Sequence, residues 1–515
     1  MGTPDKRPAC PDNSPYQSES VSDRIALIDI GSNSMRLVMY RDYGRYPFPL
    51  FNERVTVKLG QGLDETGRLA EERVKVALQA IRRFAQILTP LQPDQIVIIA
   101  TAALRRAENA AAFIQPAEQI LGHKIQVVPA EEEARLVTLG LTANLPAIDG
   151  LVADLGGGSL ELVLVSSGQV KKAVSLNIGH LSTRTKTEIR DIVAQVDWLA
   201  EAEGKTLYGV GGSFRALGSA FVTTTAYPLH LLHGLIIRPK HRKALLKRIR
   251  TGDDLSGIPA GRRATIGTAA IILTELFRKA KSGPLMISGT SIRDGMIADM
   301  TQNRLSDDDP LTLTCLEIAR QTQRSPELNE SLNKMLVPVA SHFAADKNQK
   351  ALFGDLFRLT KAACLLSDIS WNEPSDLRGQ MAYDKVIALP VYGLTHKERA
   401  WIGKAIFHRY VGVKKNKPSM VATDKLLSKT ERASARAVGL GMRFGHIFCG
   451  GHAPFLNQLV LTVKDNTLYC RTGQQGRSLM DEHSARRLQL FAEACGLRLD
   501  LDNGPDRQKN ERQTG

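Results

Sequence analysis

The sequence predicts an α/β protein made of two related lobes, followed by a mainly α-helical region. Three observations lead to this prediction. Up to about residue 300, apolar runs typical of buried strands alternate with amphipathic helical patterns. A strand, an aspartate, a small-residue turn and a second strand begin near residue 25 and recur near residue 151. From about residue 310, amphipathic helical patterns dominate.

Domain boundaries follow from these changes in pattern. The 515-residue chain is too long for one ordinary core, and its length predicts about three domains. The acidic "LSDDDP" stretch ends in a proline that would break a helix. We therefore expect a disordered polar tail (1–23), a first lobe (24–150), a second lobe (151–305), a mainly helical domain (306–505) and a polar tail (506–515).

Each lobe opens on a buried strand. In the first lobe, "RIALIDIG" is apolar up to Asp29, and "SMRLVMY" follows after a short turn. "AEERVKVALQAIRRFAQIL" has helical periodicity, "QIVIIAT" is a further buried strand, and "AEEEARLVTLGLTANL" is a helix. In the second lobe, "GLVADLGGGSLELVLV" repeats the opening design, and "TLYGVGGSFRALG" and "GPLMISGTSIRDGMIADM" continue it. This weak internal repeat indicates related lobes.

The later region reads as helices from "TLTCLEIARQTQ" onward, with one exception. "QLVLTVKDNTLYCRT" predicts a late hairpin that turns at Asp465-Asn466.

Composition narrows the class of protein. The chain is 43% hydrophobic and 23% charged, which is typical of globular proteins, and no apolar stretch is long enough for a membrane span. The N-terminal residues lack the apolar core of a signal peptide. The six scattered cysteines form no CxxC pair, so we expect a reducing cytoplasm. The net charge of +15 indicates either a polyanionic partner or simply a solvated basic surface.

Four small-residue turns (29–34, 154–159, 209–214 and 288–291) follow apolar strands. Glycine lets backbone N–H groups approach an anion closely, and successive N–H groups form anion-binding nests. One such turn could be an ordinary hairpin, but four at strand ends favour phosphate binding. The candidate phosphate-binding residues of the turns are Ser32, Asn33, Ser34, Gly156, Gly157, Gly158, Ser159, Gly211, Gly212, Ser213, Gly289 and Thr290.

Two aspartates end their strands just before such turns. Asp29 and Asp154 could hold a hard cation such as Mg²⁺, although a turn-initiating aspartate can instead bond its own backbone. Glu161 comes seven positions after Asp154, and a reversal at the glycines would let the two acids face the same way. The alternative for Glu161 is an ordinary solvent-facing residue. From the residues alone, we expect Asp29 and Asp154 to hold the metal.

Glu133 lies on the apolar stripe of its predicted helix, whereas Glu131 can pair outward with Arg135. A carboxylate near apolar neighbours has a raised pKa, which suits a general base. The alternative is that Glu133 only stabilises the helix N-terminus through the helix dipole.

Three arginines follow strand ends and could clamp phosphate: Arg36, Arg105 and Arg293. Taken singly, each fits a surface arginine better than a phosphate clamp. The sequence has no HExxH cluster, no Walker A motif and no GxSxG elbow, so a zinc hydrolase, a P-loop enzyme and a serine hydrolase are not indicated.

Together these motifs resemble the exopolyphosphatase / guanosine pentaphosphate phosphohydrolase family, a branch of the actin-like, sugar-kinase-like ATPase fold. The matching stretches are "DIGSNSMRL", "ATAALRRAENAAAF", "EEEARL", "DLGGGSLEL", "GVGGSFRAL" and "SGTSIRDGM". The resemblance implies two actin-like (ribonuclease H-like) lobes with the active site in their cleft. It implies that Glu133 activates the attacking water, with Asp154 and Glu161 as the other catalytic acids, that Glu161 shares in the metal site, and that the enzyme is a homodimer. The helical region is similar to a domain related to HD phosphohydrolases, but Ser367 stands where the histidine of a His-Asp pair would be.

The resemblance favours Mg²⁺-dependent release of terminal orthophosphate from inorganic polyphosphate, with no specific nucleic-acid partner. One alternative is hydrolysis of the 5′-phosphate of guanosine pentaphosphate by the same residues. Another is a regulator that binds polyphosphate or nucleotide without turnover, which intact acids at 133, 154 and 161 argue against. A kinase acting on sugar or in reverse is disfavoured because a water-activating glutamate suits hydrolysis.

Overall fold

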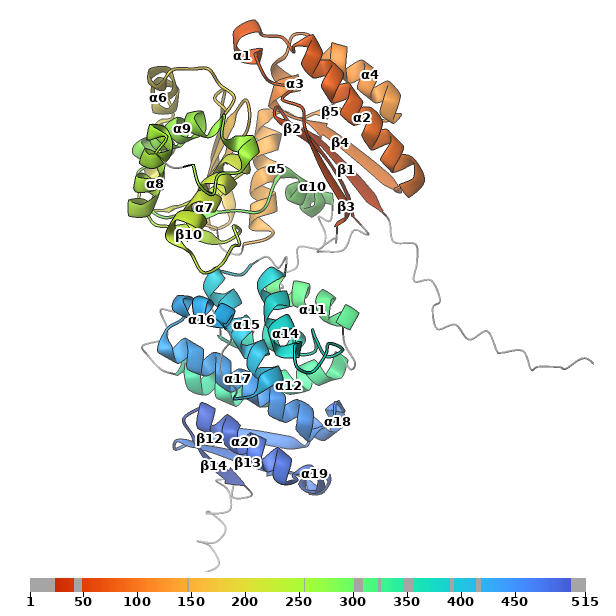
Figure 1. The fold of residues 1–515 in the computed structure, drawn as a ribbon, viewed down its shortest axis with the longest axis vertical. Helices are drawn as coiled ribbons and strands as arrows, with labels where there is room; N and C mark the ends of the chain where they lie inside the picture. The colour runs from red at the N-terminus through yellow and green to blue at the C-terminus, as the bar shows by residue number, and fades with distance from the viewer. Residues whose placement is uncertain are drawn as a thin grey trace, which may run out of the picture. The chain divides into compact units, whose positions relative to one another are not determined.

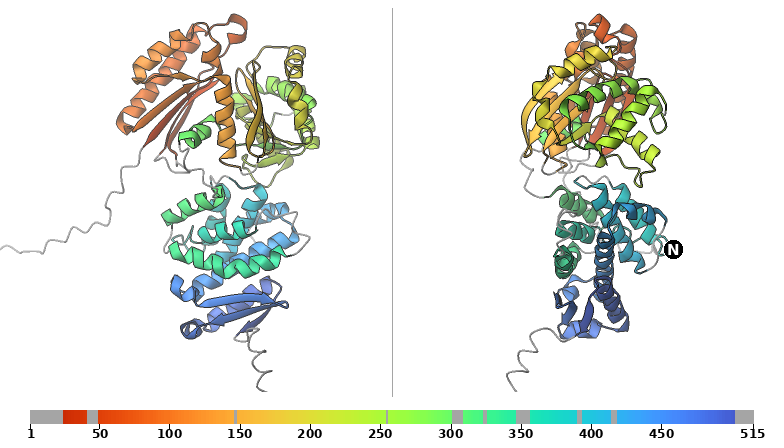
Figure 2. Two further views of the ribbon diagram at one scale, coloured as in Figure 1. Left: turned by 180° about the vertical axis from the view of Figure 1, so that it is seen from behind. Right: turned by 90° about the vertical axis from the view of Figure 1, so that its left-hand side faces the viewer.

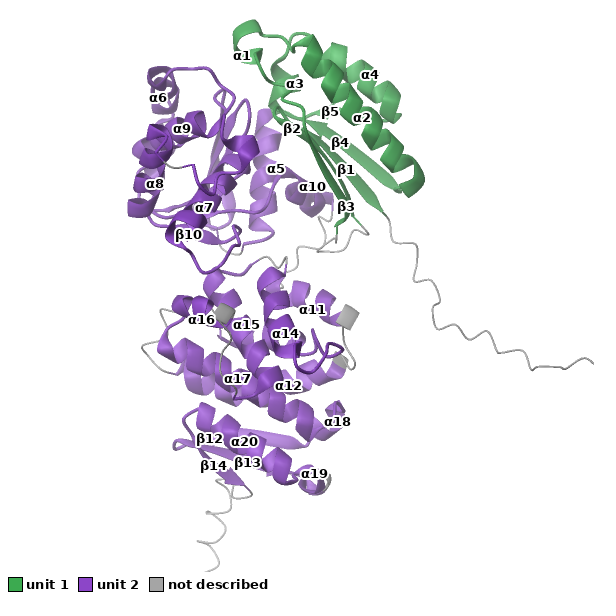
Figure 3. Ribbon diagram, viewed as in Figure 1, with its two compact units in different colours: residues 1–129 green, residues 130–515 purple. Residues whose placement is uncertain are grey.

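The structure is a computed structural model that describes residues 24–40, 49–145, 148–253, 255–300, 309–322, 326–345, 356–389, 393–413 and 418–501. The chain divides into two compact units, residues 1–129 (unit 1) and residues 130–515 (unit 2), coloured separately in Figure 3. Both expected polar tails lie outside the described residues, and so does most of the acidic stretch expected to separate the second lobe from the helical domain.

Unit 1 is built on a five-stranded sheet in the order β3-β2-β1-β4-β5. Strands β1, β2 and β3 are antiparallel neighbours, whereas β4 is parallel to β1 and β5 to β4. Every side chain of β1 is buried except that of Asp29, as its apolar sequence predicted. The strands are β1 (Ile25–Ile30), β2 (Ser34–Tyr40), β3 (Pro49–Thr56), β4 (Gln95–Ala100) and β5 (Gln126–Val127).

Helices α2 and α4 pack against each other beside this sheet (Figure 1). The side chains of Ala77, Ile81, Phe84 and Leu88 recur at helical spacing along α2 and are buried, so this stripe forms the contact with the core. The helices of unit 1 are α1 (Leu63–Thr66), α2 (Glu71–Leu91), α3 (Ala102–Arg106) and α4 (Ala111–Leu121).

Helix α5 (Ala130–Thr142) belongs to unit 2, so the compact units divide before the lobe boundary expected at residue 150. It packs against β7, β8 and α10 of that unit. Its contact with α10 is unusually close: a Cβ at Gly295 would lie 1.8 Å from the carbonyl oxygen of Leu136, and a Cβ at Gly140 would lie 2.7 Å from the Gly295 nitrogen. The two glycines therefore let the helix backbones touch.

The second lobe contains a six-stranded sheet in the order β10-β11-β9-β6-β7-β8. Strands β6, β7 and β8 are antiparallel, and β9 is parallel to β6. This arrangement repeats that of β1, β2, β3 and β4, which confirms the internal repeat and the predicted fold class. The strands are β6 (Gly150–Leu155), β7 (Leu160–Ser166), β8 (Gln169–Leu176), β9 (Thr206–Val210), β10 (Leu235–Ile237) and β11 (Leu285–Ile287).

Helices α7, α8 and α9 pack on one another beside this second sheet. With them the lobe encloses a core that includes Phe214, Leu217 and Leu273. The helices of the lobe are α6 (Lys186–Ala194), α7 (Gly212–Thr225), α8 (Pro239–Thr251), α9 (Ile266–Ala280) and α10 (Ile292–Met300), with 3₁₀ helices η1 (Asp197–Ala202) and η2 (Ala260–Arg262).

From Pro310 the described chain is mainly helical, as expected. Pro310 begins the first helix of this region, which is the position where its missing N–H costs nothing. Trp401 is fully buried in the core, and its indole N–H donates to Ser434 Oγ at 2.9 Å. The helices are α11 (Pro310–Thr322), α12 (Pro326–Ala344), α13 (Leu356–Leu365), α14 (Arg378–Ala388), α15 (His396–Val411), α16 (Pro418–Thr423), η4 (Asp424–Leu426), α17 (Lys429–Phe448) and α18 (Ala453–Leu456).

After α18 the chain forms a small sheet in the order β12-β13-β14 (Figure 2). The predicted hairpin is present, and Asp465 and Asn466 both adopt positive φ (48° and 57°) at its turn. A third strand, parallel to β13, was not predicted. The elements are β12 (Leu459–Lys464), β13 (Thr467–Thr472), α19 (Gln474–Leu479), α20 (Glu482–Ala494) and β14 (Arg498–Leu501).

Among the described residues, no helix is both long and apolar enough to cross a membrane. The five described cysteines are buried free thiols.

Candidate active site

Two of the predicted acids face each other in the second lobe. Asp154 near the end of β6 pairs directly with Glu161 on β7 in the antiparallel register. Directly opposed residues of an antiparallel pair project from the same face of the sheet. The glycine turn therefore brings both carboxylates to one side, as its reversal predicted. Glu161 is only 2% exposed, so it is not an ordinary solvent-facing residue.

Glu133 belongs to the same cluster of acids. Burial raises the pKa of Glu161 well above its ordinary value, and the negative charges of Glu133 and then Asp154 raise it further. Hydrogen bonds from Ser159 and from Ser175 Oγ, the latter at 3.1 Å, oppose this shift. Unit 2 thus gathers all three predicted catalytic acids, two from the sheet and one from the first turn of α5.

Two carbonyl groups of the turn between β6 and β7 accept backbone hydrogen bonds that hold the turn in place. His180 N–H donates to the Gly156 carbonyl at 3.1 Å, and Leu181 N–H donates to the Gly157 carbonyl at 2.9 Å. Because C=O and N–H point in opposite directions across a trans peptide, the N–H groups of Gly157 and Gly158 face the other side. The turn therefore presents successive N–H groups away from the 180–181 backbone, as an anion-binding nest requires.

The third glycine turn lies against Asp154. Gly211 has φ +90°, and a Cβ there would lie 2.4 Å from Asp154 Oδ1. Gly211 caps the 14-residue helix α7, whose N-terminus begins at Gly212 and Ser213. A helix N-terminus favours anions. A phosphate bound there would lie near the Asp154 carboxylate, and their repulsion is relieved only by a cation.

Arg262, at the end of η2, lies directly over this third turn. A Cβ at Gly212 would lie 2.0 Å from Arg262 Nη2, so the guanidinium occupies the space where a side chain at position 212 would be. His180 Nε2 lies 2.7 Å from Arg262 Nη1. A guanidinium only donates, so the imidazole nitrogen accepts and fixes the position of the arginine.

Sequence reasoning did not find Arg262 or His180. Arg262 follows no strand, and "PAGRRAT" carries no local signal of its role. The nearest sequence signal for His180 is the "NIGH" end of the segment after β8, which resembles many ordinary loops.

The fourth turn, Ser288–Ser291, differs from the prediction. Its N–H groups are already used inside the protein: Gly289 N–H donates to His233 Nδ1 at 3.0 Å, and Thr290 N–H donates to Ser288 Oγ at 3.0 Å. Ser291 N–H donates to Asp294 Oδ2 at 2.7 Å. The N–H groups of Gly289 and Thr290 could therefore reach a phosphate only by giving up these bonds.

Unit 1 contains the counterpart of the acid pair. Asp29 on β1 pairs directly with Arg36 on β2, so a carboxylate and a guanidinium share one face there. The adjoining turn is held by Asn33, whose carbonyl accepts N–H bonds from Val57 and Lys58 at 3.1 and 2.9 Å. Lys58 is exposed and adopts φ +51°, which is uncommon for a residue with a side chain. Sequence reasoning had not singled it out.

The other residues predicted to bind phosphate differ in their hydrogen bonds and in how far they are buried. Arg105 Nη1 donates to the Val128 carbonyl at 2.9 Å, which ties this arginine to the end of β5 in unit 1. Ser32, Ser159 and Ser213 are buried near their turns, while Ser34 and Arg293 are partly exposed. The expected pairing of Glu131 with Arg135 is wrong: Arg135 instead binds Glu132 at 2.8 Å and Asp299 at 2.9 Å.

The expected metal site has no ready-made cage. Within the described ranges, no group of three or more His, Cys, Asp or Glu side chains is arranged to hold a metal ion. The residues nevertheless fit Mg²⁺, which usually keeps several waters and takes one or two carboxylates together with substrate phosphates. Asp154 beside a helix N-terminus suits such a ligand, and Glu161 lies directly opposite it on β7.

The helical domain contains a second buried polar cluster. Asp368 binds Arg409 at 3.0 Å, and His446 Nε2 lies 3.0 Å from Ser367 Oγ. The arginine supplies the positive charge beside the buried aspartate, so this carboxylate is already neutralised by a side chain.

The topology of the two lobes defines a protein of the actin-like ATPase fold with a mainly helical domain attached. The chain belongs to the Ppx/GppA phosphatase family, whose model matches residues 37–304. A model described as exopolyphosphatase, C-terminal, matches residues 324–501. The protein is therefore an exopolyphosphatase-like phosphatase.

Parts of the chain are also similar to solved structures. An exopolyphosphatase from Cytophaga hutchinsonii has 20% sequence identity and a TM-score of 0.50, over 54% of this chain and 98% of that one. An exopolyphosphatase-like protein has 28% identity and a TM-score of 0.48, over 56% and 100%. A Ppx/GppA family member from Aquifex aeolicus has 22% identity and a TM-score of 0.46, over 55% and 99%.

Proposed function

We propose that the protein is an exopolyphosphatase, which hydrolyses the terminal phosphoanhydride bond of inorganic polyphosphate. The observation that carries this proposal is the grouping of Glu133, Asp154 and Glu161 in unit 2, where glycine turns and Arg262 border Asp154 and Glu161. An acid whose pKa is raised by neighbouring acids, beside anion-binding turns, is expected in a site that moves protons next to phosphate.

The proposed reaction is a single displacement by water. Glu133 accepts a proton from water as the water oxygen attacks the terminal phosphorus. The bond from that phosphorus to its bridging oxygen breaks, which releases orthophosphate and a chain shortened by one unit. The turn at Gly157 and Gly158 and the guanidinium of Arg262 hold the phosphoryl oxygens, because phosphoryl transfer depends mainly on positioning and charge neutralisation.

Asp154 would hold Mg²⁺, which would neutralise charge on the phosphate oxygens. Glu161 orients this region from within the sheet through its bonds to Ser159 and Ser175.

Helix α8 favours a polymer over a nucleotide as substrate. Its exposed side chains include Lys240, Lys243, Lys247 and Arg250, and the helix has no acidic residue. Their spacing of three or four positions places them in one stripe about 15 Å long. A linear array of cations matches a linear polyanion better than a compact nucleotide. Guanosine pentaphosphate hydrolysis is the second candidate, because the same acids would serve it.

Phosphate release from both substrates, measured side by side with and without Mg²⁺, tests the proposal. Faster turnover of polyphosphate supports it. Faster turnover of guanosine pentaphosphate would favour the second candidate, and binding of polyphosphate without any release would favour a regulator.

We also propose a homodimer in a reducing cytoplasm. The buried free thiols support the compartment, and the oligomer is tested by light scattering.

A further inference from the structure

A buried histidine of the helical domain contacts the second lobe. His396, the first residue of α15, is 4% exposed, and its Nε2 lies 3.0 Å from the carbonyl oxygen of His233. Its Nδ1 lies 3.2 Å from the Tyr227 hydroxyl. A carbonyl only accepts, so Nε2 carries the hydrogen, and Nδ1 of the neutral ring accepts from the tyrosine. Both bonds join the helical domain to the second lobe.

His233 continues this connection to the fourth turn. Its Nδ1 accepts the N–H of Gly289 at 3.0 Å, which requires an unprotonated nitrogen at that position. Burial lowers the pKa of both His233 and His396 to about 4, so both rings are neutral at physiological pH, as these bonds require. A Cβ at Gly289 would lie 3.1 Å from the Cβ of His233, so the contact is close.

Backbone contacts flank the same residue. Gly234 has φ +81°, and a Cβ there would lie 3.1 Å from the Leu394 carbonyl oxygen of the helical domain. Gly234 N–H donates to the Ile287 carbonyl at 2.9 Å, immediately before the fourth turn. The segment that carries His233 is thus held between β11 and the start of α15.

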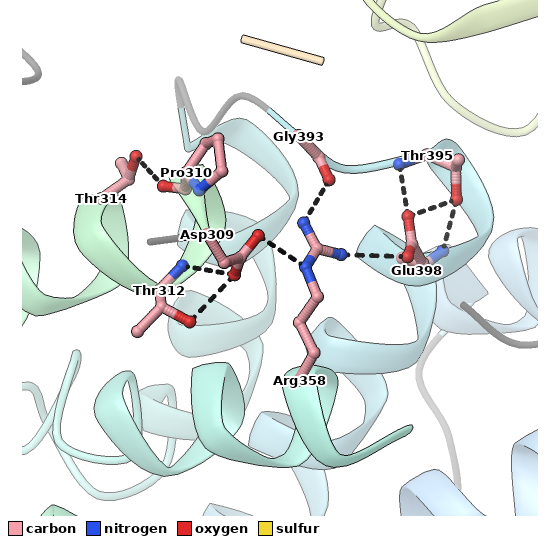
Figure 4. A network of polar contacts seen from close by, with 8 residues as sticks. All are labelled: Asp309, Pro310, Thr312, Thr314, Arg358, Gly393, Thr395 and Glu398. Carbon is pink, nitrogen blue, oxygen red and sulfur yellow. Dashed lines mark hydrogen bonds and ion pairs between the residues drawn. The ribbon is translucent and has the colours of Figure 1, made fainter. Parts of the chain in front are cut away.

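The start of α15 is held firmly by the network in Figure 4. Arg358 donates to the Gly393 carbonyl at 2.6 Å, binds Glu398 at 3.2 Å and binds Asp309 at 2.7 Å. Thr395 and Glu398 form a reciprocal capping box at the helix N-terminus. His396 lies between these anchored residues, so its backbone position is set by the helical domain.

The fourth turn leads directly to the helix that contacts α5. Helix α10 begins at Ile292, and its Gly295 touches the Leu136 carbonyl of α5, the helix that carries Glu133. Ser288 N–H also donates to the Gly209 carbonyl at 2.8 Å, beside the third turn. A shift of the fourth turn would therefore reach both the third turn and the helix of the proposed general base.

We propose that His396, acting through His233, is a positioning residue that holds the Ser288–Ser291 turn and thereby fixes α10 and the Glu133 helix. The helical domain is then part of the catalytic framework, in addition to any role in holding substrate. The consequence for turnover rests on the proposed function, whereas the hydrogen-bonded link to the turn does not.

The test compares His396→Ala with His396→Gln and with His408→Ala. Glutamine keeps a donor near the position of Nε2. His408 is the matched control: it is a buried histidine of the same helix, and its Nδ1 bonds the Gly412 carbonyl inside the helical domain. Hydrogen exchange of the Ile287–Ile292 segment reports the turn without any assay of activity. Phosphate release, divided into kcat and KM, reports the catalytic consequence.

We expect about tenfold faster exchange in this segment for His396→Ala, as loss of one hydrogen bond predicts. We expect kcat to fall by a similar factor, because the helix that carries the base is displaced, and KM to change less, because the shift reaches only one of the turns proposed to bind phosphate. His396→Gln should restore both values, and His408→Ala should change neither. Equal effects of His396→Ala and His408→Ala, or unchanged exchange in His396→Ala, would overturn the proposal.

Two further outcomes keep the inference separate from the proposed function. If the wild-type protein released no phosphate from either substrate, the proposed function would fail, but the exchange comparison would still decide the link. If His396→Ala did not fold, His233→Asn would replace it, because asparagine keeps an acceptor near the Nδ1 position. That variant should retain slow exchange at Gly289, and His233→Leu should lose it.

Discussion

Asp154 and Glu161 lie directly opposite each other on β6 and β7, and Asp29 and Arg36 hold the equivalent places on β1 and β2. The same strand-turn-strand arrangement thus carries two acidic residues in unit 2, and one acidic residue and one arginine in unit 1. Two neighbouring carboxylates repel each other, and Glu133 adds to the repulsion. The second lobe therefore holds negative charge that a bound cation would relieve.

Glu161→Gln should stabilise the protein without Mg²⁺ while lowering turnover at least about tenfold. A raised folded-state pKa means that the folded protein holds this proton more tightly than the unfolded chain. Stability is therefore lost as pH rises through the unfolded-state pKa toward the folded one. Because glutamine mimics the protonated form, the gain in Tm should be larger at about pH 8 than at about pH 5.

Glu275→Gln is the control for that experiment. Glu275 is equally buried, at 3% exposure, but its carboxylate binds Arg278 at 2.8 Å. Removing a paired charge should lower Tm slightly at neutral pH. A gain in Tm for both variants would show that removing any buried acid stabilises this protein, which would contradict the repulsion in the cluster.

Gly211→Ala should abolish most activity, whereas Gly252→Ala should not. Gly252 is in the left-handed helical region (φ +72°, ψ 9°), where alanine should cost about 1–2 kcal/mol of stability, whereas Gly211 (φ +90°, ψ 175°) is in a region that essentially only glycine adopts, so alanine should cost more there. Only at Gly211 would the new methyl meet Asp154 Oδ1, while nothing lies within 4 Å at Gly252. Thermal unfolding measures the loss of stability in each variant, and phosphate release by the folded protein measures the loss of activity. Equal activity in the two variants would show that catalysis does not depend on the position of the Asp154 carboxylate.

Arg262→Ala should raise KM by about tenfold to a hundredfold, because a charge-assisted contact to phosphate is lost. Arg263→Ala is the neighbouring control, since Arg263 is exposed and its Nε donates only to the Ile258 carbonyl among the bonds described. His180→Ala should produce part of the Arg262 effect and add little to Arg262→Ala, because the histidine acts by holding the guanidinium. Additive effects in the double variant would contradict that role.

Charge reversal on α8 should affect long polyphosphate more than short chains. Lys243→Glu with Lys247→Glu should lower kcat/KM for long chains by about tenfold at low salt and by less at high salt, because the attraction is screened. The control is Lys425→Glu, an exposed lysine of η4 in the helical domain. An equal loss on a trimer of phosphate would show that α8 does not bind the distal chain.

Much of this architecture was predictable because strand-end turns leave a clear local signal. The apolar β1 and β6 with aspartates near their ends, and the reversal that brings Glu161 opposite Asp154, follow from periodicity and turn chemistry alone. The internal repeat is visible for the same reason. The helix of Glu133 was also predicted, but it joins unit 2 through its packing against α10, β7 and β8, which no local pattern encodes.

The remaining features depend on contacts between distant segments. Arg262 forms a hydrogen bond with His180, and Gly289 forms one with His233. In each pair the two residues lie far apart in the sequence, so neither pairing can be inferred from neighbouring residues. The fourth turn has the same composition as an anion nest, yet its N–H groups bond within the protein. Composition identifies a turn that could bind phosphate, and only its partners decide whether it does.

The central claim is that Glu133 activates water for attack on the terminal phosphate, and Glu133→Gln tests it most directly. The matched control is Glu131→Gln, an exposed acid in the same first turn of α5. Phosphate release from long-chain polyphosphate with Mg²⁺ should fall by at least about a thousandfold in Glu133→Gln, while polyphosphate binding persists and Glu131→Gln keeps wild-type turnover. Wild-type turnover in Glu133→Gln would contradict the mechanism.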